Sequence, residues 1–180
     1  MKKFNFIHFL IGLIILSGAF TVAKNFYLQP DLANGEKAPD FIGMLPGDKA
    51  FKLSDLKGHY VLLDFWGSWC GPCIQDAPEL IKLHEKYSQT KFRDADGFAI
   101  VSVAVEKNKA RWENAIVRLG LLWPYHLLDP VNNFKFFDSP IANEYGVKQL
   151  PTKFLIDEKG TIVGVNMPFT EIEKYLEERK

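Results

Sequence analysis

The sequence predicts an α/β fold with a central mixed β-sheet flanked by helices, and three observations support this prediction. Apolar runs typical of strands alternate along the chain with amphipathic helical patterns, which is the arrangement of α/β domains. The run 60–66 is apolar on both faces apart from Asp64, which indicates a central strand covered on both sides. Near the end of the chain, apolar runs at 153–156 and 161–165 flank a turn and predict a hairpin that makes the sheet mixed.

Composition restricts the class of protein and the classes of function. Hydrophobic residues make up 47% of the 180 residues and aromatic residues 14%, which suits a packed domain and argues against disorder. The 22 acidic and 22 basic residues balance, so no basic excess indicates nucleic acid as a partner. The two cysteines stand at C-x-x-C spacing and are too few to cross-link the fold. They indicate redox chemistry or half of a metal site, and we expect no cofactor.

The N-terminus has the composition of an export segment. Lys2 and Lys3 precede the nearly continuous apolar stretch 6–23. A cleaved signal has an apolar region of roughly 7–15 residues and a membrane span needs about 20, so 1–23 fits a signal peptide and 4–23 a membrane anchor. The sequence leaves both open. Because the two lysines keep the N-terminus inside, the domain is expected outside the cytoplasmic membrane, in the periplasm. No cysteine lies in or just after this segment, which excludes a lipoprotein anchor.

The rest of the chain divides into a linker and one domain. Polar and turn-forming residues at 24–37 predict the linker, and 38–180 is the predicted domain. The domain is expected to open with a small hairpin, 41–44 and 50–53, around a Pro-Gly-Asp turn. A short helical turn at 54–58, closed by a glycine, leads into the central strand.

Cap and stop signals predict the helices. The longest helix runs from Cys70 to about Ser88 and contains Pro78, which should kink it. The other predicted helices are 108–119, capped by Asn108 and stopped by Gly120; 141–145, stopped by Gly146; and 170–178, capped by Thr170.

The remaining predicted strands are 98–105 and 125–128. They are followed by a loop, 129–140, that contains Phe134, Phe136 and Phe137. These rings either pack beneath their own loop, which we favour, or form a patch that faces a partner.

The stretch Cys70-Gly71-Pro72-Cys73 joins the central strand to the longest helix. A thiol is a nucleophile only as the thiolate, and the free N–H groups at a helix start stabilise a thiolate at Cys70. Pro72 suits the first helical turn, and Gly71 leaves space for another chain to approach. The spacing brings the sulfurs together across one helical turn, which predicts a redox disulfide. We expect Cys70 to be the exposed attacking thiol and Cys73, on the buried side, to be the resolving thiol.

The cysteine pair has two alternative interpretations, a zinc site and a pair of ordinary core cysteines. Zinc needs four ligands, and the histidines beyond the N-terminal segment, His59, His84 and His126, are scattered and form no metal-ligand spacing. No metal site is therefore expected. Two ordinary core cysteines would not require a position between a strand and a helix.

Two carboxylates are candidates for moving protons. Asp64 lies inside an apolar strand, where an unpaired carboxylate is costly and burial raises its pKa. Such a group beneath the cysteines can exchange a proton with Cys73. The alternative is a buried Asp that bonds only to backbone groups. Asp76 follows Cys73 by three residues and is either a second proton relay or a solvated acid in the first turns of the helix.

The chain resembles thioredoxin-fold proteins from about Gly35 to its end. The motifs that carry the resemblance are Asp64-Phe65-Trp66-Gly67-Ser68-Trp69-Cys70-Gly71-Pro72-Cys73, Pro78 and Leu150-Pro151-Thr152. The opening 38–41, the element 53–58, the N-terminal segment and an inserted strand-helix unit at 105–128 resemble the exported TlpA/ResA-type thiol–disulfide oxidoreductases.

The resemblance implies roles for site residues. Asp64 matches the buried acid of thioredoxin, and Asp76 matches an acid, more often Glu, that exported relatives place after the second cysteine. Pro151, an ordinary strand-opening proline by sequence alone, would be cis and face the disulfide, and Leu150 would offer backbone hydrogen bonds to a substrate chain. Trp69 would line the same substrate groove, together with Gly71 and Pro72. The combination of both acids leaves open which one carries the proton.

The resemblance also implies a function. Such proteins reduce protein disulfides outside the cytoplasm, often in apocytochrome c before haem attachment, and a membrane thiol-reductant donor keeps them reduced. The expected partners are therefore protein disulfide substrates, this donor and the membrane. A disulfide oxidase or isomerase, or a non-catalytic binding module, is the alternative. Peroxiredoxins share the fold but need a Pro-x-x-x-Thr/Ser-x-x-Cys loop, which residues 65–70 do not form.

Overall fold

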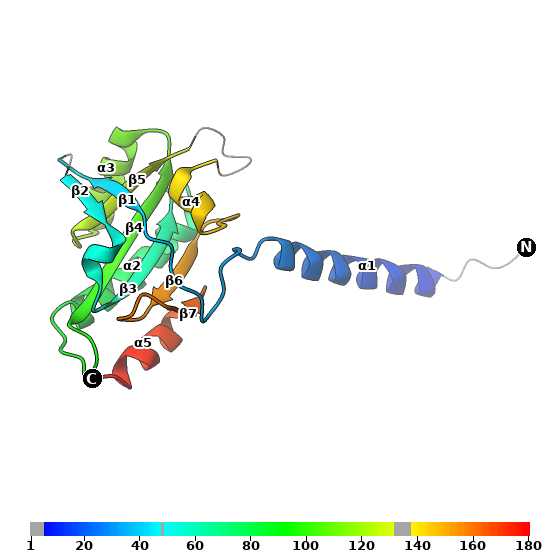
Figure 1. Cartoon of the computed structure of the whole chain (residues 1–180). Helices are drawn as coiled ribbons and strands as arrows, with labels where there is room; N and C mark the ends of the chain where they lie inside the picture. The colour runs from blue at the N-terminus through cyan, green and yellow to red at the C-terminus, as the bar shows by residue number, and fades with distance from the viewer. Residues whose placement is uncertain (1–5, 48, 132–137) are drawn as a thin grey trace, which may run out of the picture.

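The computed structural model describes residues 6–47, 49–131 and 138–180. Within these ranges a long helix, α1 (Phe6–Tyr27), projects from a layered α/β domain (Figure 1). The C-terminal end of the chain lies on the domain, far from the start of α1 (Figure 1). The fold class predicted from the sequence is confirmed.

The sheet has five strands in the order β5-β4-β3-β6-β7. In chain order they are β3 (His59–Trp66), β4 (Gly97–Glu106), β5 (Tyr125–Pro130), β6 (Thr152–Ile156) and β7 (Ile162–Val165). The strands β3, β4 and β5 are parallel neighbours, whereas β6 is antiparallel to both β3 and β7. The sheet is mixed because the closing hairpin supplies the antiparallel strands, as predicted.

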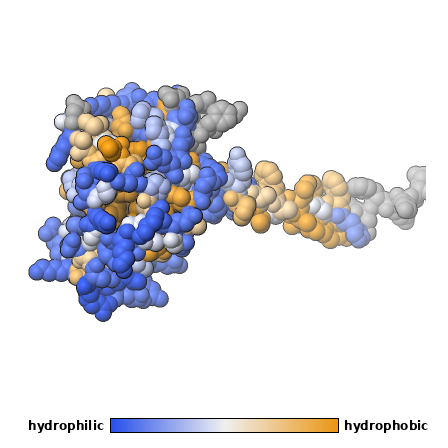
Figure 2. All heavy atoms as spheres, in the orientation of Figure 1, coloured by the Kyte–Doolittle hydropathy of each residue, from blue (hydrophilic) through white to orange (hydrophobic). Residues whose placement is uncertain are grey.

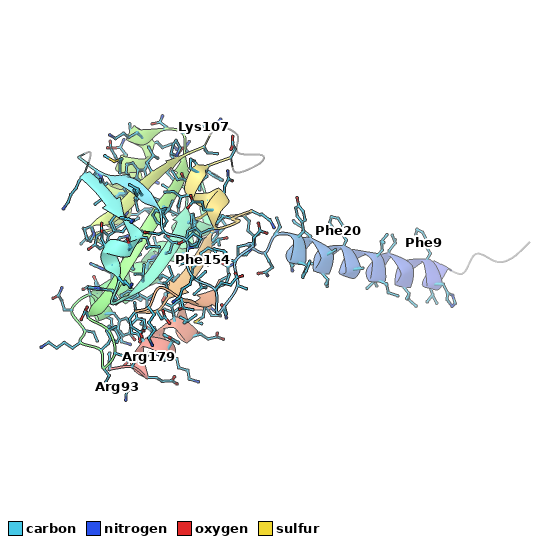
Figure 3. All side chains as sticks on the ribbon, in the orientation of Figure 1. Phe9, Phe20, Arg93, Lys107, Phe154 and Arg179 are labelled. Carbon is cyan, nitrogen blue, oxygen red and sulfur yellow. A yellow bond between two sulfur atoms is a disulfide. The ribbon has the colours of Figure 1, made fainter. Side chains whose placement is uncertain are left out.

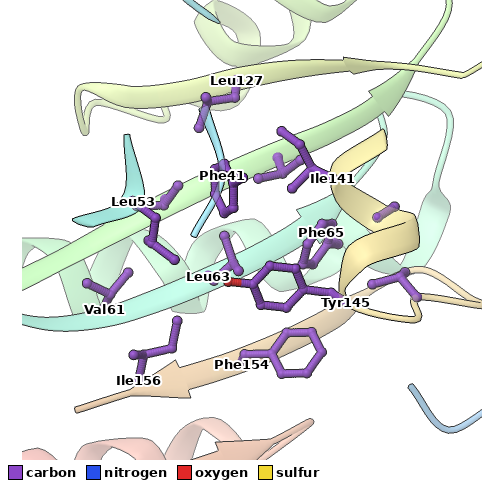
Figure 4. Packing of buried hydrophobic residues seen from close by; sticks show 14 of the residues in the cluster. Phe41, Leu53, Val61, Leu63, Phe65, Leu127, Ile141, Tyr145, Phe154 and Ile156 are labelled. Carbon is purple, nitrogen blue, oxygen red and sulfur yellow. The ribbon is translucent and has the colours of Figure 1, made fainter. Parts of the chain in front are cut away.

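The central strand β3 is buried on both faces, which explains its continuous apolar run. Val61, Leu63 and Phe65 point into one core, where Tyr145 of the α4 region and Phe154 of β6 pack against them (Figure 4). The alternate residues of β3 point into a second core formed by α2, α3 and α5. The strand that leads into the Cys70–Cys73 turn is thus held by packing on both faces of the sheet.

The predicted hairpin before the central strand is present. It consists of β1 (Ile42–Leu45) and β2 (Lys49–Lys52), followed by the 3₁₀ helix η1 (Leu53–Leu56). The hairpin lies directly on β5, since a Cβ atom at Gly43 would meet the Leu127 side chain at 2.1 Å. Only glycine allows this close approach.

Four helices complete the domain: α2 (Gly71–Tyr87), α3 (Lys109–Leu119), α4 (Pro140–Glu144) and α5 (Phe169–Glu177). Asn108 caps α3, because its side chain accepts a hydrogen bond from the N–H of Arg111 at 3.0 Å, and Gly120 ends the helix in a left-handed conformation. Both predictions are confirmed. The predicted cap Thr170 is wrong: Pro168 occupies the cap position, so Thr170 already lies inside α5.

The predicted loop 129–140 is shorter than expected at both ends. The strand β5 continues to Pro130, and α4 begins at Pro140. Phe134, Phe136 and Phe137 lie outside the described residues.

The helix α1 is apolar and separate from the domain. Figure 2 shows it as a hydrophobic projection, and Figure 3 shows Phe9 and Phe20 on it, well apart from the domain. Residues 7–27 contain an 18-residue window with a mean hydropathy of 1.9 and are long and apolar enough to cross a membrane. A signal sequence passes the same test.

The residues expected to form a linker, 24–37, are partly ordered against the domain. The helix α1 extends to Tyr27. Gly35 and Glu36 exchange backbone hydrogen bonds of 2.8 Å with Ile162 at the start of β7. The chain therefore joins the outer edge of the sheet before the predicted start of the domain at Ala38.

A second contact fixes this connection beside α4. The Lys148 ammonium binds the Asp31 carboxylate at 2.6 Å and lies 5.8 Å from the centre of the Tyr27 ring. Gly146 has a positive φ of 60°, and a Cβ atom there would meet the Asp31 side chain at 2.5 Å. The chain thus crosses directly over the turn that follows α4.

Candidate active site

The predicted strand-turn-helix unit holds the two cysteines at one end of the sheet. The strand β3 ends at Trp66, and a turn closed by a 3.0 Å hydrogen bond from Cys70 N–H to Gly67 C=O leads into α2. Trp69 is 37% exposed, and its indole N–H donates to the Val105 carbonyl at 3.0 Å. This hydrogen bond ties the turn to the end of the neighbouring strand β4.

Cys70 and Cys73 form a disulfide. Cys70 is the N-cap of α2, where its sulfur accepts a 3.3 Å hydrogen bond from the N–H of Cys73. Pro72 lies in the first turn, where a missing N–H is no loss. The helix start therefore provides N–H groups and a positive partial charge for a thiolate at Cys70.

The prediction that Cys70 is exposed is wrong for this disulfide form, because both cysteines are only 5% exposed. Both cysteines belong to the core that α2, α3 and α5 form over β3. Gly71 and Pro72 between them are exposed, so a partner can approach the disulfide from this side.

Asp64 lies on the β3 face that α2 covers. The residue is 3% exposed, and burial raises the pKa of its carboxyl to about 7. The charge of Lys153 lowers this pKa, and that of Asp76 raises it. A carboxyl with a pKa near 7 can take up and release a proton at neutral pH.

Asp76 lies one helical turn beyond Cys73 and is neither free nor fully solvated. Its carboxylate binds the ammonium of Lys153 at 2.5 Å, and its side chain is 28% exposed. The ion pair links α2 to β6. It also gives Asp76 a partner that the sequence did not predict.

The Leu150–Pro151 peptide bond is cis, as the resemblance implies. It precedes β6 directly, and the Thr152 hydroxyl donates to the Gln149 carbonyl across it at 2.8 Å. Leu150 packs against both cores, which anchors this loop on the strand next to β3.

Two buried ionisable groups at this end of the molecule were not predicted from the sequence. One is Lys153, the second residue of β6, which is followed by three apolar residues. The other is Glu106 at the end of β4, whose carboxylate accepts hydrogen bonds from the Ser68 hydroxyl and, at 2.9 Å, from the N–H of Lys107. A charged residue within or at the end of an apolar strand is the signal that identifies both.

A hollow of about 640 Å³ lies next to the turn, between α2 and α3. Its lining residues include Ser68, Trp69, Asn108, Arg111 and Arg118. It therefore adds a polar, basic surface to the exposed side of the cysteine turn.

Among the described residues, no group of three or more His, Cys, Asp or Glu side chains is arranged to hold a metal ion.

A disulfide at the turn from a central strand to a helix, with a cis-proline before the neighbouring antiparallel strand, is the arrangement of a thioredoxin-fold thiol–disulfide oxidoreductase. The chain belongs to the Redoxin family, whose model matches residues 33–177. Over 166 residues it is 34% identical to the thiol-disulfide oxidoreductase ResA of Bacillus thuringiensis (strain Al Hakam), an alignment that covers 91% of this chain and 88% of the relative. ResA of Geobacillus thermodenitrificans is 31% identical over 172 residues, with coverage of 93% and 91%.

Solved structures agree with this assignment. The thioredoxin domain of a thiol-disulfide oxidoreductase from Bacteroides vulgatus superposes with a TM-score of 0.67 at 28% identity and covers 81% of this chain and 99% of that domain. A thiol:disulfide interchange protein from a Bacteroides species gives a TM-score of 0.65 at 28% identity, with coverage of 81% and 91%. The protein is thus a thiol–disulfide oxidoreductase of the ResA type.

Proposed function

We propose that this oxidoreductase is exported, stays anchored by α1 and reduces disulfides of other proteins at the outer surface of the membrane. The observation that carries the redox assignment is the Cys70–Cys73 disulfide at the N-terminus of α2. Its position favours a thiolate at Cys70 in the reduced protein.

The proposed reaction proceeds in two exchanges. The Cys70 thiolate attacks one sulfur of the substrate disulfide, which forms a mixed disulfide and releases the other substrate sulfur as a thiolate. Cys73 then gives up its proton and attacks Cys70, which releases the second substrate thiolate and forms the Cys70–Cys73 disulfide. The substrate gains two electrons, and the protein loses two.

Asp64 is the proposed base for the second exchange. Its buried carboxylate accepts the proton of Cys73 and later returns it. The pKa of about 7 suits both transfers at neutral pH.

The substrate chain is proposed to bind along the exposed side of the turn. Gly71 and Pro72 allow close approach, Leu150 offers backbone hydrogen bonds beside Pro151, and Trp69 forms one wall. The basic hollow next to Trp69 extends this surface.

The direction of electron flow is proposed from similarity. The Gly-Pro pair between the cysteines is that of thioredoxin, which has a reducing couple. A membrane thiol donor would then return the Cys70–Cys73 disulfide to the dithiol. By analogy with TlpA/ResA-type relatives, apocytochrome c before haem attachment is the proposed substrate.

The length of α1 fits the proposed anchor. The helix has 22 residues. It continues without a break past Ala19 and Ala23, which end the two small-residue triplets, 17–19 and 21–23, that could serve as signal-peptide cleavage sites. At 1.5 Å per residue it is about 33 Å long, which matches the hydrocarbon thickness of a membrane.

Cysteine variants test the redox function. We expect Cys70→Ser to abolish reduction of insulin disulfides, and Cys73→Ser to accumulate mixed disulfides with its partners, because no resolving thiol remains. Gel analysis without reductant, followed by identification of trapped proteins, would name the substrates and show the direction of electron flow.

The double-serine variant is the matched control. If it captured the same partners as Cys73→Ser, the protein would be a binding module. Full reductase activity in Cys70→Ser would contradict the proposal.

A further inference from the structure

A buried lysine faces the proposed proton-carrying aspartate. Lys153 of β6 and Asp64 of β3 are directly opposed in the antiparallel register, so both side chains lie on the sheet face that α2 covers. Both residues are buried. A buried cation in this place is costly unless it is paired, which calls for a specific role.

Lys153 is paired with the second acid of the site. Its ammonium binds the Asp76 carboxylate at 2.5 Å, and only 10% of the Lys153 side chain is exposed. Asp76 projects from α2 one turn beyond Cys73. Lys153 therefore connects the helix that carries the cysteines to the strand that follows Pro151.

The surroundings hold Lys153 in this position. The N–H of Lys153 donates to the Asn166 side chain at 2.9 Å, and its carbonyl accepts from the N–H of Asn166 at 2.8 Å. The ammonium also lies 5.0 Å from the centre of the Phe169 ring at the start of α5. Two hydrogen bonds thus fix the backbone of Lys153, and an aromatic face lies beside its ammonium.

The charges around Asp64 are unequal. From β6 it faces Lys153, from α2 it interacts with Asp76, and from β4 its register partner is the uncharged Ser102. One cation serves two carboxylates, and it makes its direct contact with Asp76. The positive charge of Lys153 therefore stabilises the Asp64 carboxylate less than it stabilises the Asp76 carboxylate.

We propose that Lys153 is a positioning residue that binds the Asp76 carboxylate and thereby leaves Asp64 as the single acid that accepts and returns the Cys73 proton. The proposal rests on the proposed thiol–disulfide exchange. It answers which of the two acids carries the proton. It also assigns the ion pair a function in the reaction rather than in stability alone.

The proposal predicts opposite effects for the two partners of the ion pair. Lys153→Met removes the one cation that, within the described part of the chain, faces Asp64. The pKa of Asp64 should therefore rise by about one pH unit, the low end of the effect of an opposite charge at close range. Asp76→Asn removes a negative charge and frees Lys153 to compensate Asp64, so the pKa of Asp64 should fall.

The measurement uses the oxidised full-length protein, in which the cysteines do not titrate. Carbon-13 NMR follows the Asp64 carboxyl against pH, and Asp64→Asn assigns the signal. Lys82→Met is the matched control. Lys82 forms an exposed ion pair with Glu79 at 2.6 Å on α2, the helix that also carries Asp76. We expect no shift in this control.

The rate of insulin reduction shows whether the Lys153–Asp76 ion pair affects the reaction or only the pKa of Asp64. A base works when deprotonated, so the rising acid limb of the pH profile of insulin reduction should move to higher pH in Lys153→Met and to lower pH in Asp76→Asn. If Lys153→Met does not fold, Asp76→Asn still tests the proposal through its downward shift.

Three results would overturn the proposal: equal shifts for both variants, no shift in either, or carboxyl shifts without a change in the rate profile. Absence of reductase activity in the native protein is a different failure. It would reject the proposed function, and with it the proton transfer, whatever the carboxyl titration shows.

Discussion

At the scale of single residues, the proposed proton transfer depends on one carboxyl group whose burial is energetically unfavourable. Asp64 is 3% exposed, and burial raises its pKa from 3.8 to about 7. The folded protein therefore holds a proton there over a pH range in which the unfolded chain has lost it. The same property that suits proton transfer costs stability as the pH rises.

The first prediction concerns this cost. Below pH 3.8 Asp64 is protonated in both states, between pH 3.8 and 7 only in the folded state, and above pH 7 in neither. Native stability should therefore fall relative to Asp64→Asn as the pH rises through this window, by at most about 1.4 kcal/mol per pH unit. Urea unfolding of the oxidised proteins at pH 5 and pH 8 measures the difference. Glu144→Gln, an exposed change on α4, is the control, and an equal pH dependence in native and Asp64→Asn proteins would contradict the prediction.

At the scale of elements, local patterns predicted most strands and helices, and tertiary contacts decided the rest. The apolar run of β3, the Asn108 cap and the closing hairpin are local signals, and the structure confirms them. The redox pair and its strand-to-helix position were equally local. Thr170 failed as a cap because Pro168 ends the preceding extended segment first.

The Lys153–Asp76 ion pair shows what a sequence alone does not reveal. The two residues are 77 positions apart and meet only because β6 pairs with β3 in one register while α2 packs over that face. Nothing within β6 indicates which helix lies above Lys153. The burial of Cys70 was missed for a similar reason, because the sequence does not show which elements pack around its side chain in the core of α2, α3 and α5.

A second prediction concerns the turn after α4. Gly146→Ala should destabilise the protein more than Gly160→Ala, because both positions have positive φ but only Gly146 lies against Asp31. The backbone strain, about 1–2 kcal/mol, is common to both variants. Urea unfolding gives the stabilities, and limited proteolysis should show faster cleavage within 28–34 in Gly146→Ala. Equal stabilities and equal cleavage would show that the Asp31 contact is unimportant.

At the scale of the whole molecule, the chain combines an apolar helix and a redox domain that join at the sheet edge (Figure 1). The family match begins at residue 33, beyond α1 and close to the segment that pairs with β7. The domain should therefore fold without its helix.

The third prediction follows from this division. A chain that starts at Leu28 should be released from membranes, unfold at the same urea concentration as the full chain and reduce insulin at the same rate. The full chain should remain in the membrane pellet after carbonate extraction, because α1 is long enough to span the bilayer. A mature N-terminus directly after Ala19 or Ala23 would instead show that the segment is a cleaved signal.

The docked segment beside Lys148 has a consequence for kinetics. Residues 28–34, the stretch between α1 and the pairing with β7, span at most about 25 Å when fully extended. With Lys148 bound to Asp31, even this length is not all available. In an anchored protein, the cysteines would sample only a thin layer above the bilayer. Such confinement would hold the cysteines and a membrane-bound donor in the same layer, so that they meet by lateral diffusion along the bilayer.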